Sequence, residues 1–450
     1  MLLIASVVTV LLLSTLDSRA YAFTNGQSAS IVIGQKDFAS AEIATSQKGL
    51  ILPVKVVFDP SGNLWVGDAG NNRVLEFRPP FSTDMEASLV IGQPNFTAGA
   101  PATTQSGLRG QVFDEGVMGL GFDSSGNLWV ADSPNNRVLE FKTPFSIGIS
   151  ASSVIGQKDF DTALQGGSRD GLNFPSAVAF DRSDNLWVLD QFNNRVLEFK
   201  PPFSDGMNAS LVIGQIDFET SASSTTQSGL GGGVIGDLAI DPSGNLWVGD
   251  AGNNRVLEFK LPFSSGMNAS LVIGQASFVT KSSSMTESGL TGFYGAGVAF
   301  DPTGNLWVGD TYNNRILEFQ PPFSPGMDAS LVIGQQNFRT STSSTSQSGL
   351  SAPSHLGFDS SGNLWVPDYS NNRVLEFSSS SSSVTPTTSS TAQTSTASST
   401  TTTQSSLTSV TAATTDQRLG QLQNVAAGVA VLVAAIGLIA VFLRSRRSKK

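Results

Sequence analysis

Short apolar runs separated by turn-forming residues divide most of this chain into strand-sized pieces. In one representative segment the runs are VKVVF at 54–58, NLWVG at 63–67, RVLEF at 73–77 and LVIGQ at 89–93. Gly, Pro, Asn and Ser residues bound these runs, which is the pattern of short β-strands joined by tight turns. Four antiparallel strands are therefore expected in this segment.

The same segment recurs along the chain in six copies. DPSGNLWVGDAGNNRVLEF occupies both 59–77 and 241–259, and successive copies start 58 to 64 residues apart. Close variants begin at Asp123, Asp181, Asp301 and Asp359. Gly62 is placed for a positive φ in the first turn, and Asp184 replaces it in the third copy. Four strands repeated at this period predict an all-β, six-bladed β-propeller.

All the tryptophans fall in one column of the repeat, on the second strand of each unit. Blades of a propeller pack face to face, so large rings at a repeated position are expected to fill the gaps between neighbouring sheets. The predicted structural set is Trp65, Trp129, Trp187, Trp247, Trp307 and Trp365.

The order of the strands indicates how the ring closes. A first Ile-Gly-Gln strand lies in Ser28–Phe38, ahead of any core, whereas the last core ends at Phe377 with no such strand after it. The N-terminal strand is therefore expected to complete the last blade and to close the ring non-covalently. Deletion of residues 28–38 should then destabilise the whole ring.

Both ends of the chain carry patterns of membrane targeting. An apolar run followed by Ala20-Tyr21-Ala22 fits a signal peptide with its cleavage site, and an uncleaved anchor is the alternative. Val425–Leu443 carries no charge, is long enough to cross a bilayer, and precedes a basic tail expected in the cytoplasm. The expected division is a signal peptide at 1–22, a propeller at 23–377, a disordered Ser/Thr-rich stalk, glycosylated or unmodified, at 378–420, a transmembrane helix at 421–443 and a tail at 444–450.

Composition narrows the classes of partner. The 450 residues carry a net charge of −10, and the basic run RSRRSKK is concentrated at the C-terminal end. An acidic body argues against a nucleic-acid partner, because phosphates require a basic surface. The chain has no cysteine, which excludes disulfides, thiolate metal sites and a cysteine nucleophile.

The repeated core resembles the NHL repeat. The resemblance rests on Asp-x-x-Gly-Asn-Leu-Trp-Val-x-Asp followed by Asn-Asn-Arg-Val-Leu-Glu-Phe, and it covers residues 28–377. It implies a six-bladed propeller used as a binding platform. Some members of the family are sensor domains outside membranes and others are lyases. Lactonases, which are also six-bladed propellers, share the Gly-Asn-Leu-Trp-Val pattern, so the resemblance does not determine an activity.

Charged residues that repeat in every unit are better explained by blade construction than by one active site. Asp68, Arg73 and Glu76 recur in all units, and the arginine can pair with an acid of its own or the next blade. The preceding turn has a second interpretation, since Asp59, Ser61 and Asn63 offer oxygen atoms of the kind that Ca²⁺ prefers. No other cofactor is expected, and no catalytic residue is assigned.

The units differ at one column of the strand nearest the channel, four residues before the repeated Asp59 position. The column reads Lys55, Gly119, Ala177, Asp237, Gly297 and His355. Lys55, Asp237 and His355, the only histidine, form a candidate ligand-binding set at the channel mouth. Ordinary variation at an exposed strand end is the alternative. One histidine is too few for the multi-histidine zinc site that a lyase of the resembling family would need.

The loops after the Ile-Gly-Gln strands vary in length and charge, so they form the expected binding surface. Each ends in Gly-Leu, as at Gly49-Leu50, and the leucine is expected to pack into the next blade. The Ser/Thr-rich parts should project on the same face as the Asn-Asn-Arg loops. Three sequons, at Asn95, Asn208 and Asn268, are candidate N-glycosylation sites if the domain is exported.

These features favour a cell-surface binding module over an enzyme. The propeller would lie outside the cell, held by one C-terminal helix, and would recognise an extracellular protein, peptide or glycan. One alternative is an extracellular metal-dependent lyase or lactonase-like hydrolase with its site at the channel mouth. The other is a structural component of the envelope or an adhesion component.

Overall fold

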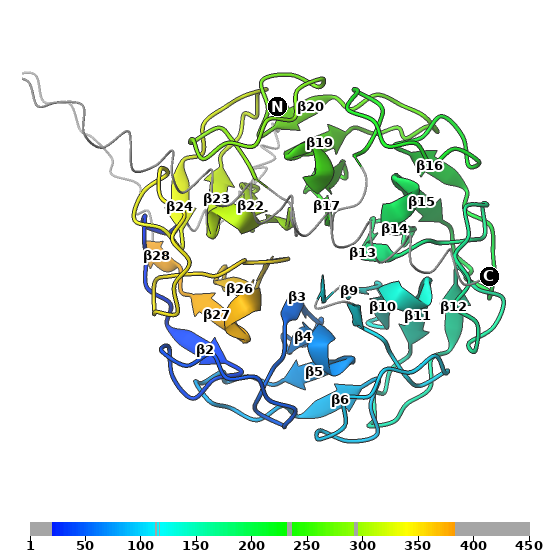
Figure 1. Ribbon diagram of the computed structural model, residues 1–450, viewed down its shortest axis with the longest axis horizontal. Coiled ribbons are helices and arrows are strands. Elements are labelled where there is room, and N and C mark those ends of the chain that lie inside the picture. Colours follow the sequence, from blue (N-terminus) through cyan, green and yellow to red (C-terminus); the bar gives the residue numbers. More distant parts are fainter. Residues whose placement is uncertain (1–19, 113–114, 117, 232–235, 292–295, 383–450) are drawn as a thin grey trace, which may run out of the picture. The chain divides into compact units, whose positions relative to one another are not determined.

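The computed structural model describes residues 20–112, 115–116, 118–231, 236–291 and 296–382. Within these residues, six four-stranded antiparallel sheets stand around a common centre in the order of the sequence, each with its first strand innermost (Figure 1). The predicted six-bladed propeller is therefore confirmed. The sheets are called blades 1 to 6 below.

The strands have the following bounds. Blade 1 contains β3 (Pro53–Phe58), β4 (Leu64–Asp68), β5 (Arg73–Phe77) and β6 (Leu89–Ile91). Blade 2 contains β9 (Gly119–Phe122), β10 (Leu128–Asp132), β11 (Arg137–Phe141) and β12 (Ser153–Ile155), and blade 3 contains β13 (Pro175–Phe180), β14 (Leu186–Asp190), β15 (Arg195–Phe199) and β16 (Leu211–Ile213). Blade 4 contains β17 (Leu238–Ile240), β18 (Leu246–Asp250), β19 (Arg255–Phe259) and β20 (Leu271–Ile273), and blade 5 contains β21 (Val298–Phe300), β22 (Leu306–Asp310), β23 (Arg315–Phe319) and β24 (Leu331–Ile333). Blade 6 contains β25 (Gly357–Phe358), β26 (Leu364–Asp368), β27 (Arg373–Phe377) and β2 (Ile31–Ile33).

A short 3-10 helix, which the sequence pattern did not predict, joins the second and third strands of every blade. These helices are η1 (Ala69–Asn71), η2 (Ser133–Asn135), η3 (Gln191–Asn193), η4 (Ala251–Asn253), η5 (Thr311–Asn313) and η6 (Tyr369–Asn371). In η1 the following residue, Asn72, ends the helix in the left-handed region with φ +53°. Asparagine tolerates this region better than most residues, which accounts for the second Asn of the repeated pair.

The turn between the first and second strands has the predicted conformation. Gly62 has φ +81°, and Asp184, which replaces it in blade 3, has φ +58°. The outermost strand is shorter than predicted, because Gly92 turns the chain away at φ +88° directly after Ile91.

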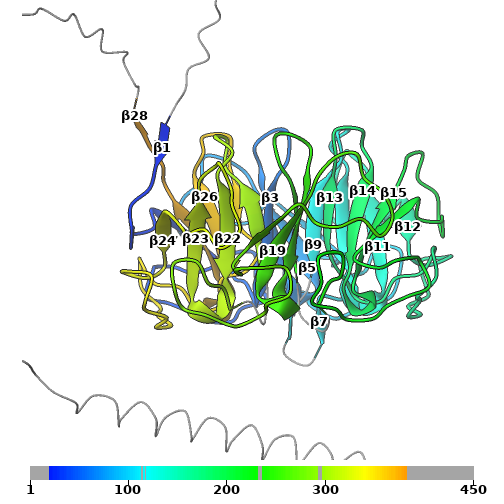
Figure 2. The ribbon, with the colours of Figure 1, turned by 90° about the horizontal axis from the view of Figure 1, so that it is seen from above.

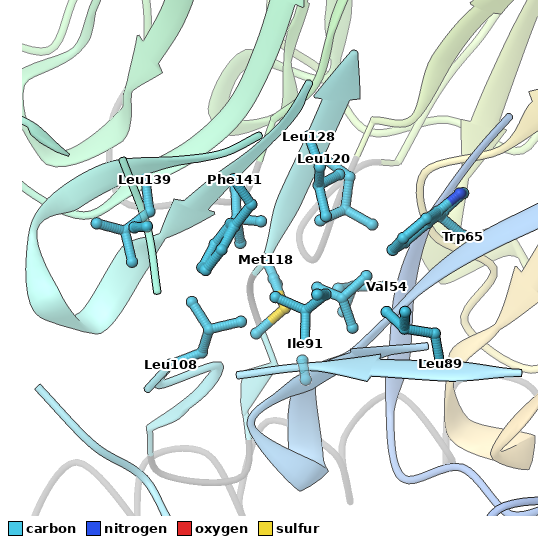
Figure 3. Packing of buried hydrophobic residues seen from close by; sticks show 14 of the residues in the cluster. Val54, Trp65, Leu89, Ile91, Leu108, Met118, Leu120, Leu128, Leu139 and Phe141 are labelled. Atoms are coloured by element: carbon cyan, nitrogen blue, oxygen red, sulfur yellow. The ribbon is translucent and has the colours of Figure 1, made fainter. Parts of the chain in front are cut away.

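The tryptophans fill the gaps between blades, as predicted. Trp65 is fully buried and packs with Leu120 and Leu128 of the next blade (Figure 3). Its indole Nε1 donates a hydrogen bond of 3.0 Å to Asp59 Oδ2, so the polar edge of the ring is satisfied. Burial of such a side chain is worth at most about 5 kcal/mol, which makes this column a large contributor to ring stability.

The N-terminal segment closes the ring, as predicted. Strand β2 pairs antiparallel with β27, with Val32 opposite Leu375. The segment before β2 also belongs to the ring, because the ring of Phe23 meets Trp307 edge-on at 5.0 Å. The backbone N–H of Gly26 donates to the carbonyl of Val332, at the edge of β24. The closing segment thus begins at Phe23.

Two terminal strands were not predicted. Strand β1 (Ala20–Ala22) pairs antiparallel with β28 (Ser380–Ser382), so the first residues of the expected stalk are strand instead of disordered chain. Residues 1–19 of the expected signal peptide, the rest of the stalk, the expected transmembrane helix at 421–443 and the tail at 444–450 lie outside the described residues. Among the described residues, no helix has the length and apolar character needed to span a bilayer.

The two sides of the ring differ in their loops. One side carries η1 to η6 and the chain entering each innermost strand, and we call it the loop face. The other side, the turn face, carries the Asp-x-x-Gly-Asn turns. Strands β1 and β28 leave the ring on the side opposite the hairpin of β7 (Gln111–Val112) and β8 (Glu115–Gly116), which precedes β9 on the loop face (Figure 2).

Candidate functional site

The repeated aspartate and arginine are structural, as predicted. Arg73 Nε donates to Asp68 Oδ2 at 2.7 Å, and both side chains are fully buried. The guanidinium also reaches the carbonyls of Ser46 and Gly49, and that of Phe96 in the next loop. The same pair recurs in every blade. Each arginine therefore joins two successive loops to its own blade.

Burial dominates the electrostatics of these repeated carboxylates. It raises the pKa of all six aspartates, although the paired arginine charge and the hydrogen bonds oppose the effect. The pKa reaches about 6 for Asp190 and for Asp368. Because the same arrangement occurs six times around the ring, it does not single out an active site.

In the turn that was considered as a calcium site, the aspartate carboxylate accepts hydrogen bonds from the turn itself and from the following strand. Asp59 Oδ1 accepts the backbone N–H groups of Ser61 and Asn63, and Oδ2 accepts Asn63 Nδ2 and Trp65 Nε1. A cation at this turn would have to displace these four donors. The described residues contain no group of three or more His, Asp or Glu side chains arranged to hold a metal ion.

The structure brings two of the channel candidates into direct contact. Lys55 Nζ lies 2.9 and 2.8 Å from Asp237 Oδ1 and Oδ2. Lys55 is on β3 of blade 1 and Asp237 directly precedes β17 of blade 4, so the pair joins opposite blades of the ring. Burial alone would raise the pKa of Asp237, but the Lys55 charge and the hydrogen bonds lower it overall. The charged groups expected at an exposed channel mouth therefore neutralise each other in the interior.

His355 lies beside this pair. Its backbone N–H donates to Val54 and its carbonyl accepts from Val56, so the chain at His355 runs parallel to β3. The side chain is 1% exposed, and neither ring nitrogen has a hydrogen-bond partner among the described residues. Burial lowers the pKa of His355 to about 4; the Asp237 charge opposes this shift and the Lys55 charge adds to it.

The small residues of the same column have a packing reason. A Cβ on Gly119 would lie 2.6 Å from the carbonyl oxygen of Ser176, and a Cβ on Gly297 would lie 2.6 Å from that of Ser354. Neighbouring innermost strands approach too closely there for any side chain. The column is therefore packed in the interior and is not the exposed strand end considered as the alternative; ligand binding by Lys55, Asp237 and His355 stays a prediction.

The loops after the outermost strands pack as predicted. Leu50 is fully buried at the interface of blades 6 and 1. Its Cδ1 packs so closely on Gly34 that a Cβ atom added to this glycine would lie only 2.6 Å away. The Ser/Thr-rich part contacts the loop-face helices, since Thr45 Oγ1 donates to Asn71 Oδ1 at 2.6 Å. We call the six loops between the outermost strand of one blade and the innermost strand of the next, together with η1 to η6, the loop surface.

The loop surface carries most of the exposed apolar side chains. Of the nine large apolar residues exposed among the described residues, seven lie on it: Ile43, Leu164, Phe192, Ile216, Val279, Met285 and Tyr312. The other two, Ile147 and Leu261, lie in loops that lead to outermost strands. Exposed apolar residues gathered on loops of a rigid scaffold are typical of a binding surface.

Two of the hollows among the described residues are also in these loops. One of about 350 Å³ is formed by the loop before blade 3, with Lys158, Thr162 and Asp170 in its wall. One of about 220 Å³ is formed by the loop before blade 1. A third, of about 370 Å³, lies over the Asp241, Asp301 and Asp359 turns, whose carboxylates are occupied by their own turns.

The three sequon asparagines are exposed. Asn95 follows β6, and its Oδ1 accepts two hydrogen bonds from Thr97. Asn208 and Asn268 occupy equivalent positions before β16 and β20. Exposure is compatible with glycosylation at all three sites, which stays a prediction.

Comparison with known proteins agrees with this architecture. The NHL repeat model matches residues 50–77 and 296–319, which are cores of blades 1 and 5. No curated protein matches the chain. An auxiliary nutrient binding protein from Bacteroides ovatus is 10% identical, with 79% of this chain and 78% of that chain covered and a TM-score of 0.51. Virginiamycin B lyase from Staphylococcus aureus is 12% identical, with 72% of this chain and 94% of that chain covered and a TM-score of 0.40. A streptogramin B lyase is 9% identical, with 78% of this chain and 97% of that chain covered and a TM-score of 0.41.

The fold defines the class of protein as a six-bladed β-propeller with a packed centre. The cores of blades 1 and 5 match the NHL repeat, and the other blades carry similar cores with the same Asn-Leu-Trp-Val pattern.

Proposed function

We propose that this protein is a cell-surface binding module that recognises an extracellular protein, peptide or glycan through its loop surface. The observation that carries the proposal is that seven of the nine exposed large apolar side chains among the described residues lie on that surface, where Ile43, Leu164 and Ile216 are each more than two-thirds exposed. Leaving such side chains in water is unfavourable, and a bound partner would cover them.

Because the centre of the ring is packed, the loop surface is a better candidate for the binding site than the channel. The Lys55–Asp237 pair spans the ring, and both charges are buried. A ligand that bound in the channel beside this pair would have to break a buried ion pair, which is energetically costly. A metal-dependent lyase or hydrolase would likewise need Asp237 and His355 released from their packing. No described feature favours that alternative over binding.

The topology is compatible with anchoring at the C-terminal end. Strands β1 and β28 leave the ring away from the loop face (Figure 2). The chain that leads to the expected helix at 421–443 would then leave the ring on the side away from the loop face. Cleavage after Ala22 would leave Phe23, where the closing segment begins, as the first residue. Export and anchoring are parts of the proposal.

The experiment compares two sets of substitutions in the full chain. The loop variant replaces Ile43, Leu164 and Ile216 with serine. The matched control replaces Ile147 and Leu261, which are exposed apolar residues outside the loop surface, with serine. Each protein is immobilised by its C-terminal tail and exposed to solubilised envelope material from its own organism. The loop variant should lose capture while the control retains it. Equal capture by both, or no capture by the wild type, would overturn the proposal.

A further inference from the structure

One ion pair in the described part of the chain removes both a lysine amine and a carboxylate from water. The side chains of Lys55 and Asp237 are 8% and 0% exposed. In the other lysine–carboxylate pairs among these residues, the lysine side chains are 45% to 60% exposed. The buried pairs repeated in the blades use arginine, whose guanidinium keeps its proton and is no nucleophile. A lysine amine, by contrast, becomes a nucleophile when it loses a proton.

The amine of Lys55 is in contact with the carboxyl group of Asp237. Nζ lies 2.9 Å from Oδ1 and 2.8 Å from Oδ2, the two oxygens bonded to Cγ. Oδ2 also accepts the backbone N–H of Val298 at 3.2 Å, whereas Oδ1 accepts no other hydrogen bond from the described residues. The two oxygens therefore differ, because a backbone donor holds one of them and only the lysine holds the other.

The backbone on both sides holds the two groups together. Lys55 lies opposite Gly67 of β4 and forms a parallel bridge with His355 of blade 6. The carbonyl of Asp237 accepts the N–H of Gly249 at 2.9 Å. The His355 ring is neutral at neutral pH because burial lowers its pKa to about 4, so it adds no charge beside the pair. Groups held in contact in this way react readily, since the entropy of bringing them together is already lost.

Burial also favours a neutral product over the ion pair. Two charges in a protein interior lose their hydration, and their mutual attraction only partly compensates for that loss. An amide bond between the two side chains would carry no charge. Its hydrolysis would require water beside side chains that are 8% and 0% exposed. Condensation is therefore favoured here in a way that it is not between exposed side chains.

We propose that Lys55 and Asp237 join in an intramolecular amide bond once the chain has folded. A proton passes from Nζ to Oδ1, which leaves an amine and a carboxylic acid. The nitrogen lone pair then forms the bond to Cγ, and the N–H of Val298 stabilises the negative charge that develops on Oδ2. The Cγ–Oδ1 bond breaks, and Oδ1 leaves as water with a second proton from Nζ. One ammonium and one carboxylate thus give one amide and one water, and no co-reactant is consumed.

The bond would be a covalent link across the ring. Lys55 is on β3 of blade 1, and Asp237 directly precedes β17 of blade 4, 182 residues further along the chain. The chain has no cysteine, so a disulfide cannot supply such a link. A cross-link between residues so far apart restricts the unfolded chain and stabilises the ring. This proposal is independent of the loop surface, so the failure of one leaves the other untouched.

Peptide mapping of the full chain by mass spectrometry tests the proposal. In the folded protein, trypsin should not cleave after Lys55, and peptide 49–73 should be joined to the peptide that contains Asp237. The joined peptide should be lighter than the sum of its parts by the mass of one water. The same chain, isolated from inclusion bodies in denaturant before it folds, should give the free peptide 49–55. Lys142 is the internal control, because it lies 3.5 Å from Glu140, is 58% exposed and should keep a free amine.

A variant tests the need for the amine. Lys55→Arg keeps the positive charge but has no reactive amine, so it should give no joined peptide while the fluorescence of the buried tryptophans shows a folded ring. A free peptide 49–55 from the folded wild type, in place of the joined one, would overturn the proposal. Joined peptides in the unfolded chain or at Lys142 would also overturn it, because burial would then not be the cause. If Lys55→Arg does not fold, the map of the wild type decides alone.

Discussion

Acidification should weaken the folded ring through His355, and the size of the effect follows from its burial. The free imidazole titrates near pH 6.5, whereas the pKa of His355 is lowered to about 4 in the folded chain. The unfolded chain therefore binds a proton that the folded chain excludes between these values. The stabilising contribution is fully present above pH 6.5 and is lost as the pH falls towards 4. Between about pH 7.5 and about pH 5 the loss is about 2 kcal/mol of unfolding free energy.

The assay is urea unfolding followed by fluorescence of the buried tryptophans, at both pH values, for the wild type and His355→Phe. His355 is the only histidine, so the difference between the two proteins isolates its titration from that of the carboxylates. Phenylalanine also removes two ring nitrogens that lack partners among the described residues, so the variant should be at least as stable near neutral pH. An identical pH dependence of both proteins would show that His355 does not cause the loss of stability.

Three further changes test the packing. Lys55→Met should cost about 3–5 kcal/mol because it leaves Asp237 buried without a partner, and adding Asp237→Leu should recover much of this loss in urea unfolding. Gly34→Ala should lower the free energy of unfolding by about 2 kcal/mol or more, because the new Cβ would clash with Leu50. Gly62→Ala should lower it by only about 1 kcal/mol, because Gly62 also has a positive φ but no atom lies within 4 Å of the new Cβ. A chain that lacks residues 23–33 should unfold at lower temperature in calorimetry, and an unchanged transition would contradict ring closure by this segment.

The repeated part of the fold could be predicted because each unit supplies its own evidence. The strands, the positive φ of Gly62 and Asp184, the Trp65 column and closure by β2 all follow from local patterns or from the order of segments. The 3-10 helices were missed because a single helical turn is too short to show a hydrophobic periodicity. Strand β28 was missed because its serine-rich sequence matches that of the stalk.

The site could be predicted only in part. The column of Lys55, Asp237 and His355 was found because its residues differ between units, but its burial was not predicted, and ligand binding there stays a prediction. Opposite charges in units 1 and 4, which stand opposite in a ring of six, were the available signal for an ion pair across the centre.

In the proposed function, partners bind the loop surface and not the channel or the turn face. Hydrogen–deuterium exchange of the full chain, with and without captured envelope material, tests it most directly. Exchange should become slower in the loops at 34–52, 156–174 and 214–231 and should stay unchanged in the turns at 59–63 and 241–245. Protection confined to those turns, or to the channel strands β3 and β17, would contradict it.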